Sequence, residues 1–400
     1  MVVRGALAAV IIGILVGAGP ALPATARADL AEVTVFAGTG QAGYGGDGGP
    51  AALALLANPT GVAVAADGTV FIGDSTNRRV RAVRPDGTIV TVAGSGRAGD
   101  RARPVTGPAP ATGVDLSSPQ RLAVGRDGTL YLADPGLLRV FALSTDGRLS
   151  VAAGVGSARD LNDGGPAVGA GMGEPRGLAV AADGTVYVAD FGNRRVRAVS
   201  PSGVITTVAG TGSAQATAAG GPAARVAVPG PDGLAVDGAG TLWIVDGQTL
   251  RRVRGDRMDT VTYPDGRWAT SDVASWPPPQ PALVGVSAVA ASGDQVYTVN
   301  QATGGVYRLR DGGSMEQVAD LRGVLPGPSV GQLAVAPSGT VYLADVNSHR
   351  VYMFRPAPPG GVGSGDRAES RWPFLAGGAL AVVVVVAVGW WLSARRRSGA

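Results

Sequence analysis

The chain has 400 residues, and its 64 glycines, 28 prolines and only 16% charged residues favour many short strands joined by tight turns over long helices. The formal charge of +4 comes from the ends, because without Arg4, Arg27 and Arg395 to Arg397 the remaining 29 arginines face 30 acidic residues, a net charge of −1. This balance disfavours nucleic acid as a partner. The absence of cysteine excludes disulfides and thiolate metal sites, and a single histidine excludes most histidine-rich zinc sites.

Residues 1–28 have the layout of a secretory signal peptide. Arg4 precedes an apolar run of about 14 residues, which is short for the alternative of an uncleaved membrane anchor. A Gly-Pro pair and a stretch of small residues follow. We expect cleavage after Ala26 or Ala28, and therefore export.

The middle of the chain repeats one unit six times. The clearest copies begin NPTGVAVAADGTVFIGD at residue 58, SPQRLAVGRDGTLYLAD at 118 and EPRGLAVAADGTVYVAD at 174. Aligned on the residue before the first strand, the six units start at 59, 119, 175, 231, 284 and 330. Periods of about 40 to 60 residues with several strands per unit are typical of β-propeller blades.

Each unit contains apolar, β-branched runs that predict four strands, for example 177–181, 186–189, 196–199 and 204–209. Asp183-Gly184 separates the first pair, and Ser202-Gly203 the last pair. Glycine accepts the positive φ that such hairpin turns need. One four-stranded sheet buries little apolar surface, so we expect six sheets packed around a common axis.

The last unit stops after its third strand, at residues 351–354. Residues 32–40, EVTVFAGTG, match the fourth-strand segment ITTVAGTG at 205–212. We predict that this N-terminal strand completes the last blade, because two disconnected fragments would leave an unpaired sheet edge at each end. The predicted fold class is all-β: a six-bladed β-propeller over residues 29–356, closed by an N-terminal strand, plus one C-terminal transmembrane helix.

The C-terminal region predicts a membrane anchor. A Pro/Gly-rich linker at 357–373 leads to residues 374–392, which carry no charge and as a helix span about 28 Å. The arginines of the tail at 393–400 favour the cytoplasmic side, so the propeller is expected outside the cell membrane. The alternative, a sorting tail cut by a transpeptidase, lacks an LPXTG-like motif.

The units resemble NHL repeats through G-L-A-V, then D-G-T-V-Y-V-A-D, then N-x-R-V, best seen at 177–196. The likeness covers about 32–356 and is weakest in the fifth unit, where Asn300 and Gly305 replace the usual Asp and Arg. The stretch GDGGPA at 46–51, echoed at 163–167 and 220–223, is similar to that of extracytoplasmic NHL proteins. The resemblance implies a propeller used mainly for binding, as in the sensor domains of bacterial receptor kinases, although no kinase motif is present here.

An aspartate recurs in five of the units, each time followed by an arginine, and this recurrence favours a structural role. A short aspartate side chain accepts turn amides and is expected to pair with the arginine across the loop. His349 shares the loop position of Arg78 and Arg194 and is not expected to be catalytic. Asp47 and Asp163 offer one carboxylate each, far fewer than the roughly six to eight oxygen ligands of Ca²⁺, so we expect no metal and no cofactor. The recurring residues are Asp74, Asp134, Asp190, Asp246 and Asp345, followed by Arg79, Arg139, Arg195, Arg252 and Arg350.

Strand direction sorts the loops onto two faces. The Asp-Gly turns lie on one end of the ring, here called the hairpin face, and the aspartate loops lie on the other, the linker face. The long segments 39–57, 95–117, 155–173, 211–230 and 264–283 are expected on the linker face, where recognition usually resides. The chain should leave the ring on the hairpin face, which would then look toward the bilayer.

Two sets of residues on the linker face are candidate ligand contacts. The proline-rich segment 263–281 holds Trp268 and Trp276, which suit stacking against a glycan or peptide, or alternatively pack over the core. The residues entering the first strands at the channel mouth differ between blades, as an asymmetric site requires, or alternatively are only solvated polar groups. They are Gln120, Arg121, Glu174, Arg176, Asp232 and Gln332.

These features predict a membrane-anchored binding or sensing module for an envelope glycan or protein ligand, without catalysis. One alternative is a lactonase- or lyase-like propeller with a metal at the channel mouth. It is disfavoured because Glu174 and Asp232 are the only clear carboxylates there, Arg176 competes for them and no histidine is available. Another alternative is a structural subunit of an envelope complex, contacted through the side of the propeller.

Overall fold

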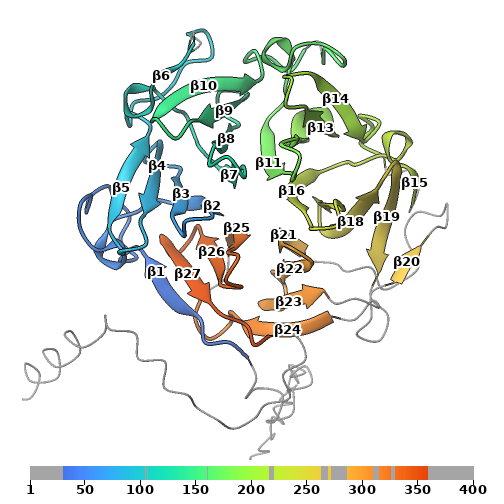
Figure 1. The fold of residues 1–400 in the computed structure, drawn as a ribbon. Helices are drawn as coiled ribbons and strands as arrows, with labels where there is room; N and C mark the ends of the chain where they lie inside the picture. Colours follow the sequence, from blue (N-terminus) through green and yellow to red (C-terminus); the bar gives the residue numbers. More distant parts are fainter. Residues whose placement is uncertain are drawn as a thin grey trace, which may run out of the picture. The chain divides into compact units, whose positions relative to one another are not determined.

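The computed structural model describes residues 30–103, 105, 107–159, 161–215, 220–262, 269–271, 286–309, 315–325 and 329–358. Within them, antiparallel strands form six sheets, the blades, arranged around a central axis (Figure 1). From the axis outward, blade 1 contains β2 (Pro59–Val64), β3 (Val70–Asp74), β4 (Arg79–Val83) and β5 (Ile89–Ala93). Blade 2 contains β7 (Arg121–Val124), β8 (Leu130–Asp134), β9 (Arg139–Leu143), β10 (Arg148–Ala153) and β6 (Ala109–Pro110). Blade 3 contains β11 (Pro175–Val180), β12 (Val186–Asp190), β13 (Arg195–Val199) and β14 (Ile205–Ala209). Blade 4 contains β16 (Pro231–Val236), β17 (Leu242–Asp246), β18 (Thr249–Arg254) and β19 (Arg257–Thr262), and β19 also pairs with β15 (Gly220–Pro222) and β20 (Ala269–Ser271). Blade 5 contains β21 (Val286–Ser292), β22 (Gln295–Asn300), β23 (Gly305–Leu309) and β24 (Met315–Asp320). Blade 6 contains β25 (Val330–Val335), β26 (Val341–Asp345), β27 (Arg350–Phe354) and β1 (Thr34–Ala37).

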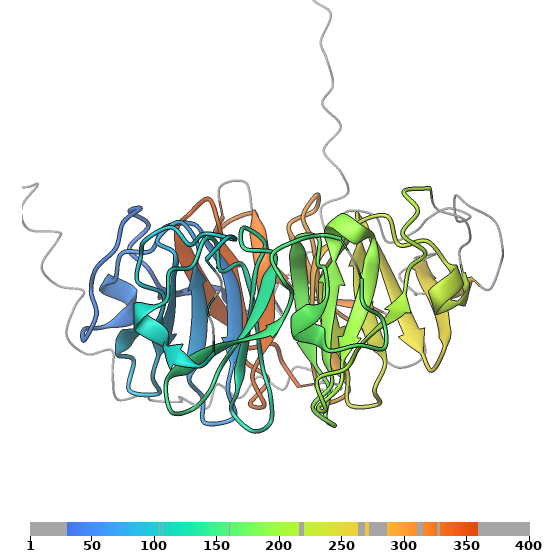
Figure 2. The same ribbon diagram turned by 90° about the horizontal axis from the view of Figure 1, so that it is seen from above.

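The ring is closed. The first strands of neighbouring blades contact one another from β2 through β7, β11, β16 and β21 to β25, and β25 contacts β2. Seen from the side, the strands run between two loop-bearing faces (Figure 2). The predicted six-bladed propeller is therefore confirmed.

The N-terminal strand completes blade 6, as predicted. β1 runs antiparallel to β27, with Thr34 opposite Met353 and Val35 opposite Tyr352. The ring of Phe36 packs edge-on against that of Tyr342, with centroids 4.9 Å apart. Closure thus joins strands more than 300 residues apart and protects two sheet edges at once.

Strand register corrects the start of the fifth unit. Val286 opposes Asn300 in blade 5 as Pro175 opposes Asp190 in blade 3, so this unit starts at 286 and not at 284. The prediction was wrong here because the fifth unit has neither the proline that begins the first strand in units 1 to 4 nor the glycine that follows it in units 1, 3 and 4.

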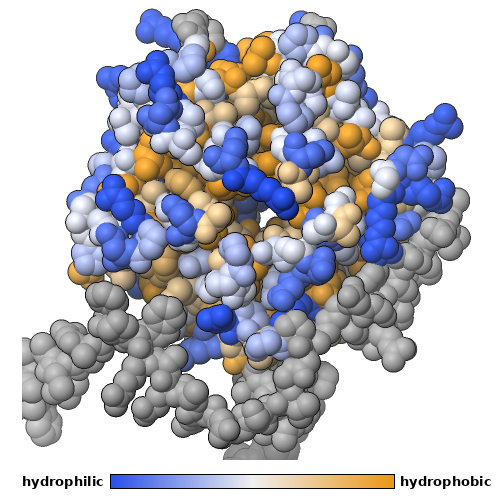
Figure 3. Space-filling view, viewed as in Figure 1, coloured by the Kyte–Doolittle hydropathy of each residue, from blue (hydrophilic) through white to orange (hydrophobic). Residues whose placement is uncertain are grey.

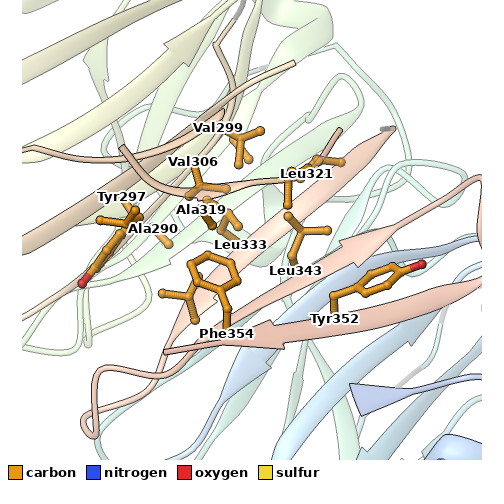
Figure 4. Packing of buried hydrophobic residues seen from close by; sticks show 14 of the residues in the cluster. Ala290, Tyr297, Val299, Val306, Ala319, Leu321, Leu333, Leu343, Tyr352 and Phe354 are labelled. Carbon is orange, nitrogen blue, oxygen red and sulfur yellow. The ribbon is translucent and has the colours of Figure 1, made fainter. Parts of the chain in front are cut away.

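The core lies between the blades. Six clusters of buried apolar residues each join two neighbouring blades. Figure 4 shows the cluster between blades 5 and 6, where Val306 and Ala319 lie near Leu333 and Leu343. Burying one such aliphatic side chain contributes about 1.5 to 3 kcal/mol, so each blade is stabilised largely by its neighbours.

Glycine sets the distance between first strands. A Cβ on Gly177 would lie 2.1 Å from the carbonyl oxygen of Asp232, and one on Gly61 would lie 2.7 Å from that of Gln120. Neither distance is physically possible without a backbone shift. The glycine of the G-L-A-V motif therefore permits the close approach of blades at the axis.

The prediction that the long inter-blade segments lie on the linker face was wrong for the middle of these segments. Pro50 bridges Thr88 and Pro166 bridges Val204, while β6 pairs with β10 and β15 with β19. The Pro-Ala stretches therefore cover the outer edges of the blades that they lead into, which hides unpaired backbone groups. A short 3₁₀ helix with a buried first alanine follows each of them: η1 (Ala51–Leu53), η2 (Ala111–Gly113), η3 (Ala167–Gly169) and η5 (Ala223–Arg225).

In the part of the chain that the structure describes, no helix combines the length and apolar character needed to cross a membrane. The predicted signal peptide at 1–28, membrane helix at 374–392 and tail at 393–400 lie outside that part, as does the linker from 359 onward. Trp268 and Trp276 also lie outside it, so their proposed contact with a ligand stays a prediction.

Candidate ligand site at the propeller axis

The recurring aspartates are structural, as predicted. Asp74 accepts the backbone amide of Ala57 at 2.8 Å, and Asp190 accepts that of Gly173 at 2.7 Å, so each aspartate fixes the segment entering its blade. All five recurring aspartates are buried. Burial raises the pKa of four of them above the ordinary value, against the opposing effect of these hydrogen bonds: Asp74, Asp134, Asp190 and Asp246.

The expected pairing of these aspartates with the arginine across the loop is wrong. Arg79 donates to the carbonyl oxygens of Asn77 at 3.0 Å and Ser95 at 2.9 Å, and so ties the turn to the outgoing linker. Blade 4 has no arginine at this position, because Asp246 opposes Thr249. Arg252 is therefore not the equivalent of Arg79 in blade 4.

The ionic partners of three aspartates are fully buried arginines further along the third strand. Arg197 lies 3.5 Å from Asp190 and 2.6 Å from Asp163. Blade 1 repeats this arrangement with Arg81, Asp74 and Asp47, and in blade 4 Arg251 lies 2.7 Å from Asp246. The aspartates of the glycine-rich loops thus neutralise buried arginines.

His349 also has a structural contact. Its Nδ1 accepts the backbone amide of Asn58 at 3.1 Å, which links blade 6 to the segment entering blade 1. Its φ of 54° matches the 55° of Arg78 and the 53° of Arg194, as expected for one shared loop position.

At the axis, Arg121 stands where blades 1, 3 and 4 have glycine. Its Nε donates to the carbonyl oxygen of Arg176 at 3.1 Å, and its guanidinium lies 2.9 Å from a carboxylate oxygen of Asp232. One side chain therefore joins blades 2, 3 and 4. Because the Arg121 side chain is only 12% exposed, this ion pair is screened less than a surface pair.

Gln332 makes a second connection across the axis. Its Oε1 accepts the amides of Val62 at 3.2 Å and Leu122 at 3.0 Å, and its Nε2 donates to the carbonyl oxygen of Leu122 at 2.7 Å. The space left beside Arg121 and Gln332 is about 10 Å³, about the room needed for one water molecule. Gln332, predicted as a ligand contact, therefore holds blades 6, 1 and 2 together.

The other residues predicted as ligand contacts, among them Glu174, Arg176 and Gln120, have partners within the protein. Arg176 pairs with Glu174 at 3.1 Å and stacks 3.6 Å above the centroid of Phe191. Gln120 donates to Ser118 in its own segment at 3.1 Å. The structure thus brings together the side chains of Arg121 and Asp232 and the backbone of Arg176, while the side chains of Arg176, Glu174 and Gln120 have other partners.

A cavity of about 500 Å³ opens beside the Arg121–Asp232 pair at the linker face. Gln248, Ser287 and Gln301 add polar groups to its wall, and the Oγ of Ser287 is buried without a hydrogen bond to any described residue. The sequence analysis missed these three residues. The sequence did contain a signal, because Gln248 and Gln301 are non-repeating polar residues that closely follow the position of the recurring aspartate in their units.

The mouth is polar and has no metal cluster among the residues that the structure describes, where no three His, Cys, Asp or Glu side chains lie close enough to hold an ion. On the face drawn in Figure 3, hydrophilic side chains gather around a narrow opening at the centre of the ring. The carboxylates of Asp232 and Glu174 are each paired with an arginine.

Comparison with protein families gives a match to the Teneurin NHL domain over residues 26–156 and 155–219. Protein SUPPRESSOR OF QUENCHING 1, chloroplastic, of Arabidopsis thaliana is 36% identical over 92 residues, covering 23% of this chain and 8% of that protein. Mouse Teneurin-3 is 38% identical over 98 residues (21% and 4%), and Drosophila melanogaster Teneurin-m is 30% identical over 184 residues (44% and 7%). The match thus spans less than a tenth of each of these relatives.

Solved structures of similar shape share little sequence with this chain. An auxiliary nutrient binding protein from Bacteroides thetaiotaomicron is 9% identical with a TM-score of 0.50, covering 80% of this chain and 75% of that one. A putative gluconolactonase is 15% identical with a TM-score of 0.49 (82% and 94%), and a streptogramin B lyase is 11% identical with a TM-score of 0.48 (82% and 98%). At these identities the likeness concerns the fold alone.

Proposed function

Because residues 34–354 form an NHL-repeat β-propeller, we propose that the protein is a binding module that takes a polar envelope glycan or protein segment at the linker-face mouth of its axis. One observation carries the proposal: the cavity beside the Arg121–Asp232 pair is lined by polar groups that differ from blade to blade. An asymmetric ligand needs such a wall, whereas the repeat by itself would supply six equivalent positions.

The chemistry of the mouth suits a neutral polar ligand. The charges of Arg121 and Asp232 offset each other, and the amides of Gln248 and Gln301 and the hydroxyl of Ser287 border the same cavity. Amide and hydroxyl groups match the hydroxyls of a sugar or the backbone of a peptide.

We also propose that the propeller works outside the cell membrane, after removal of residues 1–28 and with residues 374–392 as its anchor. The supporting evidence is the sequence pattern of these segments. The test is protease treatment of intact cells: loss of the propeller with survival of a tagged C-terminal fragment supports this topology, and full protection of the propeller contradicts it.

The binding proposal is tested with the full-length protein against a panel of wall glycans and wall-derived peptides. For any ligand found, Asp232→Asn should weaken binding about tenfold, because it removes the carboxylate that orients Arg121 in the mouth. Asp183→Asn, in a hairpin turn on the opposite face, is the matched control and should leave binding unchanged.

Equal affinity of the Asp232→Asn variant and the wild type would place binding elsewhere, as the structural-subunit alternative requires. Stoichiometric metal in the purified protein, together with turnover of a lactone, would replace the proposal by the enzyme alternative.

A further inference from the structure

The axial cavity is bordered by charged atoms that the protein itself leaves unused. Arg121 donates its Nε to the carbonyl oxygen of Arg176 and its Nη2 to one carboxylate oxygen of Asp232. The Nη1 of Arg121 and the other carboxylate oxygen of Asp232 make no hydrogen bond to any described residue. Both side chains line the cavity, so it has one charged donor and one charged acceptor to offer a ligand.

A β-bulge adds a third unused group to the same wall. The register of β21 shifts on either side of Ser287, and the same bulge holds Thr60 in blade 1 and Arg176 in blade 3. The hydroxyl of Thr60 bonds to that of Ser75, and Arg176 pairs with Glu174. The Oγ of Ser287, in contrast, is buried without a hydrogen bond to any described residue. A buried hydroxyl that stays unpaired costs free energy, which a bonding ligand atom would recover.

The charge balance of the cavity favours a ligand that carries both signs. A cation that approaches Asp232 also meets the charge of Arg121, and an anion that approaches Arg121 also meets that of Asp232. An ammonium and a carboxylate held side by side allow opposite charges to alternate, with a charge-assisted hydrogen bond to each residue. The side chains of Arg121 and Asp232 are only 12% and 33% exposed, so solvent screens these contacts less than on an open surface.

We propose, on the basis of the function proposed above, that this cavity binds an α-amino acid zwitterion. Its ammonium group donates to Asp232, and its carboxylate accepts from Arg121 and from the hydroxyl of Ser287. The side-chain amide of Gln248 also borders the cavity and makes no hydrogen bond to any described residue, so a polar side chain on the ligand suits the remaining wall. The source of the zwitterion is a free amino acid, or a peptide segment that presents both groups on one carbon.

The test is isothermal titration of the full-length protein with L-glutamine as the probe. N-acetyl-L-glutamine lacks the ammonium group and L-glutaminamide lacks the carboxylate, so these two molecules are the comparators. L-glutamine should bind with a Kd on the order of 1 mM, the affinity open to a ligand of this size. Each comparator should bind at least about tenfold more weakly, because it loses one charge-assisted hydrogen bond and keeps the group that the opposing residue repels.

A fourth molecule, N-ethyl-L-glutamine, distinguishes the two sources. It keeps the zwitterion and extends the side chain as an attached peptide would. Binding equal to that of L-glutamine supports a zwitterion carried by a peptide segment, and binding of L-glutamine alone supports a free amino acid.

Two variants locate the site. Asp232→Asn should weaken L-glutamine about tenfold without weakening N-acetyl-L-glutamine, whereas a merely structural defect would weaken both. Ser287→Ala should weaken L-glutamine at least about threefold at an unchanged melting temperature, because the hydroxyl has no partner in the described protein. Thr207→Val is the matched control, since the hydroxyl of Thr207 is also buried and unpaired but lies on β14, the outermost long strand of blade 3, and should leave binding unchanged.

The proposal is overturned if either comparator binds as tightly as L-glutamine, if neither Asp232→Asn nor Ser287→Ala weakens binding, or if no saturable binding occurs up to about 20 mM, well above the expected Kd. A neutral glycan or peptide that binds, loses affinity with Asp232→Asn and is not displaced by L-glutamine would overturn this proposal and leave the proposed function standing. Absence of an effect of Asp232→Asn on every ligand would contradict both.

Discussion

Replacing Arg197 by methionine tests whether the buried arginines hold the blades or merely fill space. Arg197 is fully buried and lies between Asp190, also fully buried, and the half-exposed Asp163. Methionine keeps most of the packing volume and removes the charge. Removing one partner of a buried ion pair costs about 3 to 5 kcal/mol, and the packing that methionine retains favours the lower end of that range.

The size of the effect can be converted to a melting temperature. An unfolding entropy of about 2.1 cal/mol/K per residue gives roughly 0.7 kcal/mol/K for a propeller of about 320 residues. A loss of about 3 kcal/mol therefore lowers the midpoint by about 4 to 5 °C at pH 7, as measured by differential scanning calorimetry.

The deficit should shrink in acid. Burial already raises the pKa of Asp190, and loss of the neighbouring guanidinium raises it further. A carboxyl group whose folded pKa exceeds its unfolded value destabilises the fold above the folded pKa, and this penalty disappears as the pH falls through it. The difference between variant and wild type should therefore be smaller at about pH 4.5 than at pH 7.

Blade 2 offers the matched control, since Phe141 occupies the same strand position there. Phe141→Met should cost about 1 kcal/mol with no dependence on pH. The reasoning is refuted if Arg197→Met melts within about 1 °C of the wild type at pH 7, or if its deficit is the same at both pH values.

Two further predictions concern stability. Gly177→Ala places a methyl group 2.1 Å from the carbonyl oxygen of Asp232 and should cost about 1 to 3 kcal/mol, whereas Gly113→Ala, with nothing within 4 Å, should be neutral; equal melting of the two variants would contradict this. Burial acts to raise the pKa of Asp47, but hydrogen bonds from neighbouring side chains, including Arg81, outweigh it and lower the pKa. Asp47→Asn should therefore cost about 1 kcal/mol at pH 7, and this cost should fade as the pH drops below about 4, so a deficit that persists undiminished at pH 3 would count against the assignment.

The candidate site was only partly predictable. The non-repeating residues at the channel mouth included Arg121 and Asp232, which the structure pairs across two blades, because a long charged side chain in place of the axial glycine reaches a neighbouring blade. The same reasoning could not tell that Gln332 bonds to the backbone of Leu122 in another blade. Whether an amide side chain reaches a neighbouring strand depends on the inter-blade distance, which sequence spacing does not contain.

The sequence by itself determined the repeat, the strands, the Asp-Gly turns, the number of blades and the closing strand β1. The reason is that hydrophobic period and turn chemistry are local properties, and the same pattern occurs in six copies of the unit. Only the tertiary structure decided which charges meet. The aspartates pair with Arg81, Arg197 and Arg251 and not with the arginines opposite them in the turn, because side chains on neighbouring antiparallel strands and on an edge-covering linker converge in space at separations that no sequence pattern records.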